Sequence, residues 1–184
     1  EAGEIPLTVW SFDARTILSR LGERHGAAFA DKGVRFELGE LSSLPIRTDE
    51  EKLCKIIDVL VLNGLKFTET GSVRVDAASL TDGGLELRVR DTGIGMRPEE
   101  IAEVLEGFRQ ADPTARKRFR GIGLGLRLVT RLVAAVGGSL DVHSTLGGGT
   151  EFVVTIPPLG ESAAPAVSSG IPMAPLSEAK VQLS

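Results

Sequence analysis

Alternating apolar and polar positions predict a set of short strands along the chain. At residues 34–38, valine, phenylalanine and leucine alternate with arginine and glutamate, which is typical of a strand with one buried face. The same pattern predicts a short edge strand at residues 8–12 and further strands at residues 73–75, 85–89, 140–142 and 152–156. Glycine clusters at residues 82–84 and 147–149 indicate the turns of two hairpins.

Apolar residues at helical spacing predict helices at about residues 13–30, 49–66, 98–105 and 123–136. The expected core residues of the first helix are Ile17, Leu18, Leu21, Ala28 and Phe29. Thr48 or Asp49 would cap the second helix, whose core face would consist of Leu53, Ile56, Ile57 and Leu60. Because strands and helices mix without a repeated strand–helix–strand unit, we expect an α+β fold, a two-layer α/β sandwich with helices on one face of a mixed sheet.

Length and composition predict one domain followed by a tail. The chain has 184 residues, of which 42% are apolar and 25% charged, and this is enough to build one hydrophobic core. We expect the domain to span residues 1–159. Residues 160–184 are rich in alanine, serine, proline and glycine, which predicts a flexible tail or linker.

Charge and composition exclude several classes of function. A net charge of −4 and an aromatic content of 4% argue against nucleic-acid binding. The chain has no apolar run of about 20 residues, the length that a membrane span requires. Residues 1–4 are acidic, unlike a signal peptide, and the single cysteine, Cys54, cannot form an internal disulfide. These features favour a cytoplasmic location and no direct membrane contact by this part of the protein.

Three residues with different chemistry share one face at the end of the second predicted helix: Asn63, Lys66 and Phe67. The amide oxygen of Asn63 can bind Mg²⁺, which prefers oxygen ligands. Lys66 can pair with a phosphate, and Phe67 can pack against a flat base. A helix C-terminus in which Asn63 and Lys66 satisfy the last carbonyl groups is the alternative interpretation.

Two glycine-rich segments lie next to predicted elements in positions suited to ligand binding. Asp91 comes directly after a predicted strand, where its carboxylate can accept a hydrogen bond from an exocyclic amine, while Gly93 and Gly95 let the backbone approach a ligand. Residues 121–126 open a predicted helix and can present N–H groups to a phosphate. An ordinary turn and a tight helix start are the alternatives.

The predicted loop before residue 121 carries a local basic cluster in a chain of negative net charge. Its charged members are Arg109, Arg116, Lys117, Arg118 and Arg120. Such a loop can close over phosphates as a lid. A solvated flexible loop is the alternative.

In this order, the segments resemble the sequence boxes of the catalytic and ATP-binding domain of sensor histidine kinases, in the GHKL ATPase superfamily. Residues 63–68 resemble the N box, 91–95 the G1 box, 108–112 the F box and 121–126 the G2 box, and residues 148–152 and 156–157 also fit. The resemblance covers about residues 7–157. It implies a five-stranded mixed sheet with three main helices, and transfer of the γ-phosphoryl group of ATP to a histidine on a separate dimerisation domain.

The resemblance also implies roles for individual residues. Asp91 would bind the adenine amino group, with Gly95 and Thr150 assisting through water. Asn63 would hold Mg²⁺ on the phosphates and act with Lys66 in catalysis. The residues that would bind ATP are Asn63, Lys66, Phe67, Asp91, Gly93, Gly95, Phe108, Arg116, Lys117, Gly121, Gly123, Leu124, Gly125, Leu126 and Thr150.

Val59 departs from the family pattern. One helical turn before the metal-binding asparagine, the family usually has a second asparagine, or a general-base glutamate in the gyrase, mismatch-repair and heat-shock-chaperone branches. Valine cannot act as a base, so a self-contained ATPase of those branches is disfavoured. A degenerate kinase module that binds nucleotide or protein partners without phosphotransfer stays open as the alternative.

No histidine of this chain fits the phosphate acceptor of the family. His25 lies in the first predicted helix and His143 on a predicted strand, so we expect both to be structural or surface residues. The resemblance implies that the partners are the protein's own dimerisation and histidine-phosphotransfer domain and a response-regulator receiver domain. It also implies that the parent protein is a homodimer.

Overall fold

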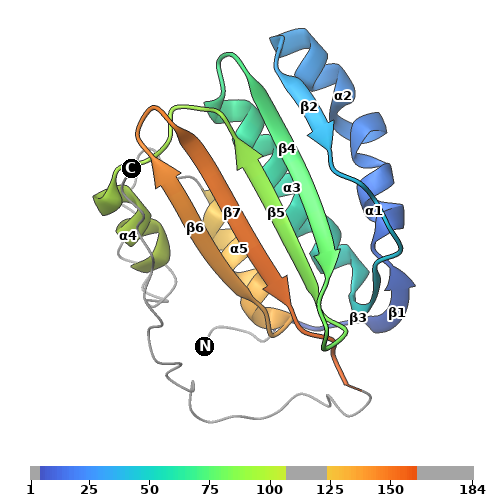
Figure 1. The fold of residues 1–184 in the computed structure, drawn as a ribbon. Coiled ribbons are helices and arrows are strands. Elements are labelled where there is room, and N and C mark those ends of the chain that lie inside the picture. Colours follow the sequence, from blue (N-terminus) through green and yellow to red (C-terminus); the bar gives the residue numbers. More distant parts are fainter. Residues whose placement is uncertain (1–4, 107–123, 161–184) are drawn as a thin grey trace.

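A five-stranded mixed sheet forms the centre of the computed structural model, which describes residues 5–106 and 124–160. The strand order is β2-β4-β5-β7-β6 (Figure 1). The strands are β2 (Arg35–Leu38), β4 (Ser72–Ser79), β5 (Leu85–Asp91), β6 (Ser139–Thr145) and β7 (Gly149–Ile156). β2 runs parallel to β4, and the other neighbours are antiparallel. The predicted mixed five-stranded sheet is therefore confirmed.

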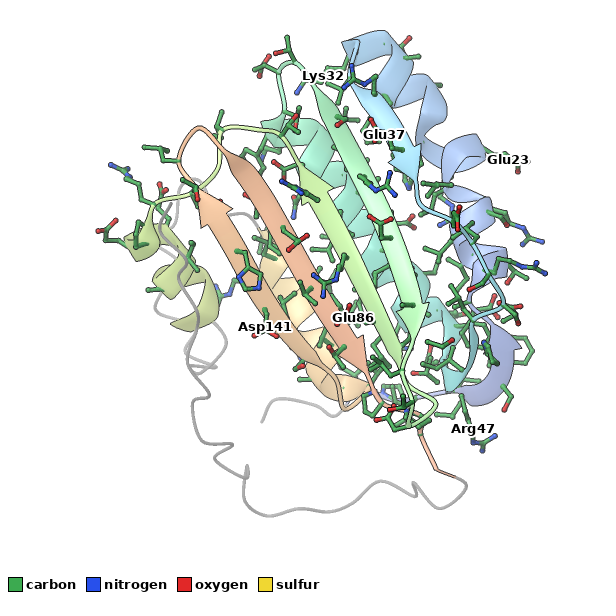
Figure 2. The ribbon with its side chains drawn as sticks, in the orientation of Figure 1. Glu23, Lys32, Glu37, Arg47, Glu86 and Asp141 are labelled. Carbon is green, nitrogen blue, oxygen red and sulfur yellow. The ribbon has the colours of Figure 1, made fainter. Side chains whose placement is uncertain are left out.

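The main helices cover one face of this sheet and leave the other face open (Figure 1). They are α2 (Leu21–Lys32), α3 (Glu50–Phe67) and α5 (Leu124–Ala135), and a shorter helix, α4 (Pro98–Glu106), contacts β6. Charged side chains such as Glu37, Glu86 and Asp141 occupy the open face (Figure 2). The two-layer α+β sandwich is thus confirmed. Among residues 5–106 and 124–160, none of the helices combines the length and apolarity that crossing a bilayer requires.

Helix α3 lies at the centre of the helical layer, and its sequence explains its bounds. Asp49 caps the N-terminus, because its side chain accepts a hydrogen bond from the Lys52 N–H at 2.9 Å. All four apolar residues expected on the core face are fully buried: Leu53, Ile56, Ile57 and Leu60. These contacts fix the helix against the sheet and so determine where its C-terminal end lies.

The N-terminal region differs from the prediction. The strand expected at the edge of the main sheet, β1 (Val9–Asp13), instead pairs antiparallel with β3 (Pro45–Asp49) in a separate two-stranded sheet. The sequence pattern missed β3, because within it only Ile46 is apolar.

The single helix expected at about residues 13–30 is two helices, α1 (Arg15–Ser19) and α2. The break falls at Arg20, whose N–H bonds to the Ile17 carbonyl three residues earlier. Ala28, expected in the core, is exposed. The buried residues of α2 are Leu21, His25 and Phe29 at four-residue spacing, and Ala28 points away from that face. Helix α2 ends at Gly33, whose φ of 72° lies in the left-handed region that favours glycine.

Candidate functional site

A cavity of about 280 Å³ opens where the C-terminal end of α3 meets the ends of β5 and β7. Its walls are Asn63, Phe67, Asp91, Ile94, Gly95, Met96, Arg97, Glu100, Leu126, Leu146, Thr150 and Phe152. Six residues that the sequence predicted for the site are in this set: Asn63, Phe67, Asp91, Gly95, Leu126 and Thr150. Residues from the N-box, G1-box and G2-box segments and the final hairpin therefore share one cavity, although they are spread over 88 positions of the chain, from 63 to 150.

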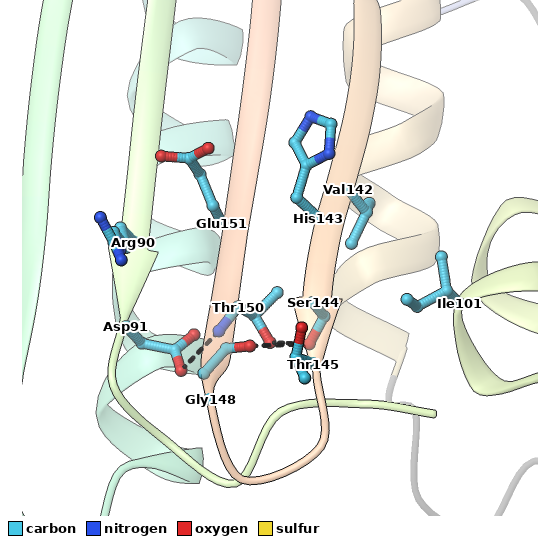
Figure 3. A pocket seen from close by; sticks show the side chains of 11 residues that line it. Arg90, Asp91, Ile101, Val142, His143, Ser144, Thr145, Gly148, Thr150 and Glu151 are labelled. Carbon is cyan, nitrogen blue, oxygen red and sulfur yellow. Dashed lines mark hydrogen bonds between the residues drawn. The ribbon is translucent and has the colours of Figure 1, made fainter. Parts of the chain in front are cut away.

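Asp91 lies at the last position of β5 and is only 5% exposed. One of its oxygens, Oδ1, accepts a hydrogen bond from the Gly93 N–H at 2.8 Å. The same oxygen accepts a second one from the Thr150 N–H at 3.2 Å (Figure 3). Within the described residues, Oδ2 accepts none. Burial raises the pKa of this carboxyl, and the two backbone hydrogen bonds offset part of the rise. Asp91 thus offers a desolvated acceptor at the wall of the cavity.

The two glycines after Asp91 are required by close backbone approaches. A Cβ at Gly93 would collide with the Phe67 carbonyl oxygen and lie 2.8 Å from Asp91 Oδ1. Gly95 has φ +65°, and a Cβ there would collide with the Thr145 carbonyl. The Ile94 N–H also bonds to the Phe67 carbonyl at 3.1 Å. The segment after β5 is therefore held against both the end of α3 and the β6–β7 hairpin.

Lys32 of α2, not Asn63 or Lys66, satisfies carbonyls at the end of α3. The Lys32 ammonium donates to the Leu65 carbonyl at 2.8 Å and the Lys66 carbonyl at 3.0 Å. The structure therefore does not support the alternative in which Asn63 and Lys66 satisfy the last carbonyls. Asn63 instead lines the cavity, while Lys66 is exposed outside its lining, with its Nζ 4.8 Å from the centre of the Phe67 ring.

The start of α5, which packs against α3, also contributes to the cavity wall. Leu126 is buried and lines the cavity, whereas Leu124 is 82% exposed and does not. Gly125 packs closely against α3, because a Cβ at this position would lie 3.1 Å from a methyl group of Val59 and in ordinary contact, at 3.8 Å, with both atoms of the Asn63 amide. The other expected site residues, Phe108, Arg116, Lys117, Gly121 and Gly123, lie outside the described residues.

A second, more open cavity of about 250 Å³ adjoins the first and shares Asp91 and Thr150 with it (Figure 3). Ser144, which the sequence pattern did not predict as a site residue, lies here. Its hydroxyl is 2.9 Å from the Thr150 hydroxyl. The sequence did carry a signal: Ser144 follows Leu140 and Val142 in the alternation of β6, where an inward-facing apolar residue is expected.

The apolar walls were also only partly predicted. Met96 and Phe152 line the first cavity, with Ile94 and Leu146 as exposed apolar residues beside them. Apolar walls that include the rings of Phe67 and Phe152, together with one buried carboxylate, suit an aromatic ring that carries a hydrogen-bond donor.

The donor set fits a hard cation that arrives with a phosphate ligand. Asn63 supplies an amide in the cavity, and the described residues hold no group of three or more histidine, cysteine or acidic side chains that could bind a metal ion. Mg²⁺ typically keeps several waters and takes only one or two protein oxygens beside substrate phosphates. The residues present therefore suit Mg²⁺ bound together with a nucleotide.

Neither His25 nor His143 lines the first cavity, although His143 lines the second. His25 is buried, and its Nε2 is 2.8 Å from Asp58 Oδ1 in a cluster that joins α2 to α3. Burial alone would raise the pKa of Asp58, but the hydrogen bonds from His25 and Arg24 outweigh it and lower that pKa. His143 is exposed on β6. His25 thus has a structural contact.

Comparisons with known proteins match this chain to histidine kinases and related ATPases. A family model described as histidine kinase-, DNA gyrase B-, and HSP90-like ATPase matches residues 48–160. The chain is 34% identical over 158 residues to the signal transduction histidine-protein kinase BarA of Escherichia coli K12, which covers 83% of this chain and 17% of BarA. It is 33% identical over 164 residues to the autoinducer 2 sensor kinase/phosphatase LuxQ of Vibrio harveyi, covering 85% of this chain and 19% of LuxQ.

Among solved structures, full-length ShkA in complex with AMPPNP matches with a TM-score of 0.70 and 33% sequence identity. The match covers 85% of this chain and 32% of ShkA. The chain spans less than a fifth of the length of either curated relative, 17% of BarA and 19% of LuxQ.

Proposed function

The chain belongs to the family of histidine kinase-, DNA gyrase B- and HSP90-like ATPases, as an ATP-binding domain of the histidine kinase type, and from this premise we propose that it is a catalytic module for phosphoryl transfer. The module binds Mg-ATP and transfers the γ-phosphoryl group to a histidine on a separate dimerisation domain. In this step the bond between the γ-phosphorus and the bridging oxygen breaks, a phosphorus–nitrogen bond forms, and ADP leaves.

One observation carries the proposal: Asn63 and Asp91 line the same cavity. Asn63 comes from α3 and Asp91 from the end of β5, so the fold brings an amide and a buried carboxylate together across the helical layer and the sheet. An amide beside phosphates and a carboxylate beside a base are the two contacts that a magnesium nucleotide needs at its two ends. The cavity volume of about 280 Å³ suits the base and sugar rather than the whole nucleotide.

The proposed roles follow from the position of each group. Asp91 Oδ2 accepts the adenine amino hydrogen, since Oδ1 is already bonded to two backbone N–H groups. Phe67, Met96 and Phe152 pack around the ring system. Asn63 directs its amide oxygen to Mg²⁺, which neutralises phosphate charge when bound. Lys66 is exposed next to this end of α3 and can reach phosphates outside the cavity.

The same proposal sets the roles of residues outside the described ranges. Phe108, Arg116 and Lys117 belong to a lid over the phosphates, and Gly121 and Gly123 shape the loop on the phosphate side. The partners are the dimerisation domain with the acceptor histidine and a response-regulator receiver domain, in a homodimeric parent protein. The acceptor histidine lies on the separate dimerisation domain, so His25, which is bonded to Asp58, and His143, which is exposed on β6 beside the second cavity, are not assigned that role.

Asn63→Ala tests the role of the amide. We expect it to abolish phosphorylation of a supplied dimerisation domain that carries the acceptor histidine, and to remove the Mg²⁺ dependence of ATP binding, while the melting temperature is retained. Lys55→Ala is the matched control, because Lys55 is exposed on the same helix and lies outside the cavity lining. Normal phosphorylation by Asn63→Ala would contradict the proposed role.

Val59 supports one alternative, a degenerate module that binds nucleotide or protein partners without phosphotransfer. The Val59 side chain packs against the hydrophobic core, and one of its methyl groups lies beside Gly125. Because valine has no polar side-chain atom, this position offers no hydrogen-bonding group near the Asn63 amide. Calorimetric titration of the wild type with ATP, with and without Mg²⁺, separates the two functions. Tight binding that is independent of Mg²⁺ and is not followed by phosphotransfer favours the alternative.

A further inference from the structure

The Ser144 hydroxyl joins three segments next to Asp91. It accepts a hydrogen bond from the Met96 N–H at 2.8 Å, contacts the Gly149 carbonyl oxygen at 2.8 Å, and lies 2.9 Å from the Thr150 hydroxyl. Met96 belongs to the segment after β5, and Gly149 and Thr150 begin β7. Figure 3 shows Ser144 beside Thr150. Through its one hydroxyl oxygen, Ser144 therefore holds both the segment after β5 and the start of β7 in place beside Asp91.

The number of hydrogens on each group determines which partner donates in each of the three contacts. A serine hydroxyl has one hydrogen to donate and can accept two hydrogen bonds. The Gly149 carbonyl can only accept, so the Ser144 hydrogen must point to it, or two acceptors would lie 2.8 Å apart. Ser144 then accepts from the Met96 N–H and from the Thr150 hydroxyl. This is the one arrangement in which all three contacts are attractive.

These bond directions limit what the Thr150 hydroxyl can do. Its hydroxyl hydrogen is used on Ser144, so its oxygen can only accept a hydrogen bond from a group in the cavity that Thr150 lines. Asp91 Oδ2 is also an acceptor without a partner in the described residues. The two side chains next to each other therefore both require a donor from the ligand.

We infer that Ser144 is a specificity-determining residue, which orients the Thr150 hydroxyl as an acceptor and so selects a 6-amino purine over a 6-oxo purine. This inference rests on the proposed nucleotide function and adds the source of its base selectivity. The amino group of ATP supplies the donors by direct contact, since a bridging water could donate both to Thr150 and to a 6-oxo group. The 6-oxo group of ITP is itself an acceptor, so it cannot donate a hydrogen bond to the Thr150 hydroxyl oxygen or to Asp91 Oδ2.

The test measures the dissociation constants of ATP and ITP by calorimetry and compares their ratio among variants. Ser144→Ala frees the Thr150 hydroxyl to rotate and donate, so we expect the ITP-to-ATP ratio to fall by about two- to tenfold, the effect of one neutral hydrogen bond. Ser144→Thr keeps a hydroxyl at a strand position that tolerates β-branching, and should keep the wild-type ratio. Thr150→Val removes the acceptor but leaves the bonds from Ser144 to Met96 and Gly149, and should lower the ratio without Ser144 being changed.

A double variant separates this role from a structural one. In the Thr150→Val background, Ser144→Ala should leave the ratio where Thr150→Val already put it, because Ser144 acts through the Thr150 hydroxyl. Equal losses of ATP and ITP affinity in Ser144→Ala, with an unchanged ratio, would overturn the inference. If Ser144→Ala does not fold, an unchanged ratio in Thr150→Val overturns it instead. Failure of the wild type to bind ATP would count against the proposed function itself.

Discussion

The backbone N–H of Thr150 lies 3.2 Å from Oδ1 of Asp91, its partner in the β5–β7 register. The Gly93 N–H bonds to the same oxygen at 2.8 Å. Two backbone donors on one oxygen fix the carboxylate plane and leave the second oxygen for a ligand. Because these donors come from β7 and from the segment after β5, the strand ends themselves set the direction of the free acceptor.

Asp91→Asn should reverse the hydrogen-bonding character of this position. The amide oxygen can keep the bonds from Gly93 and Thr150, so the amide NH₂ takes the place of the free acceptor. We expect ATP affinity to fall by about 10- to 100-fold, the effect of one charged hydrogen bond of about 1.5–3 kcal/mol, and ITP to lose much less. Calorimetric titration checks this, and an unchanged ATP affinity would show that Asp91 does not contact the base.

The melting temperature of Asp91→Asn provides a second measurement. Burial raises the pKa of Asp91, with partial compensation from the Gly93 and Thr150 bonds, so the ionised form is costly in the folded domain. The wild type should therefore lose stability relative to Asp91→Asn as the pH rises from the unfolded-state pKa, about 3.9, through the raised folded value. A constant difference between the two proteins over that window would contradict the raised pKa.

Ligand binding should depend on pH through the same carboxyl. The raised pKa means that Asp91 takes up a proton at a less acidic pH than an ordinary aspartate does. Protonation removes the charged acceptor, so affinity should fall as the pH falls through the raised value. Adenosine is the suitable probe, because it has no phosphate to titrate. An affinity that stays constant down to the ordinary aspartate pKa of about 3.9 would be the contrary result.

The sequence predicted those features of the fold and the site that depend on residues close to each other in the chain. Helix α3 has a capping aspartate and a regular apolar face, so its bounds follow from neighbouring residues. Gly95 was predicted as a position where the backbone can approach a ligand, and the structure adds a local reason for glycine, a left-handed φ of +65°. In both cases the local conformation follows from residues within a few positions of each other in the chain.

The parts that escaped prediction depend on distant partners. Strand β3 has a weak alternation of its own and is fixed by its pairing with β1, where Phe12 faces Ile46. Lys32 satisfies the end of α3 from 33 positions earlier in the chain, and Ser144 bonds to Met96 across 48 positions. A sequence pattern describes faces and turns, but it does not say which side chain reaches which carbonyl or hydroxyl across the fold.

Asp49 should contribute strongly to stability. Its carboxylate is 1% exposed and accepts from the Thr8 N–H at 2.7 Å and the Lys52 N–H at 2.9 Å, so it joins the start of α3 to the residue before β1. We expect Asp49→Ala to lower the free energy of unfolding at neutral pH by about 2–3 kcal/mol, measured by urea denaturation. Glu51→Ala is the control, because Glu51 is exposed in the same helical turn.

The stability difference between wild type and Asp49→Ala should also depend on pH. Burial alone would raise the pKa of Asp49, but the bonds from Thr8 and Lys52 outweigh it and lower that pKa. A lowered folded pKa means that the stabilisation is complete above the unfolded value of about 3.9 and is lost as the pH falls through the folded value. A difference that grows on acidification would contradict this sign.

Lys32→Met should loosen the end of α3 without touching the cavity. The ammonium bonds to the carbonyls of Leu65 and Lys66, where the helix dipole is negative, so its loss should cost about 1–2 kcal/mol of stability. The amide of Thr68, bonded to the Gly64 carbonyl at 3.1 Å, should then exchange with deuterium faster.

Asn63 lies two and three residues before these carbonyls, within the same last part of α3, and this connects Lys32 to the proposed function. If the ammonium holds the last turn in place, Lys32→Met should weaken Mg-ATP binding more than it weakens binding of adenosine, which does not need the amide of Asn63. Lys32→Arg, which keeps a cationic donor, should recover most of this difference, and Lys55→Met on the exposed side of α3 should have no effect. Unchanged Thr68 exchange in Lys32→Met would mean that the helix end is held by packing alone.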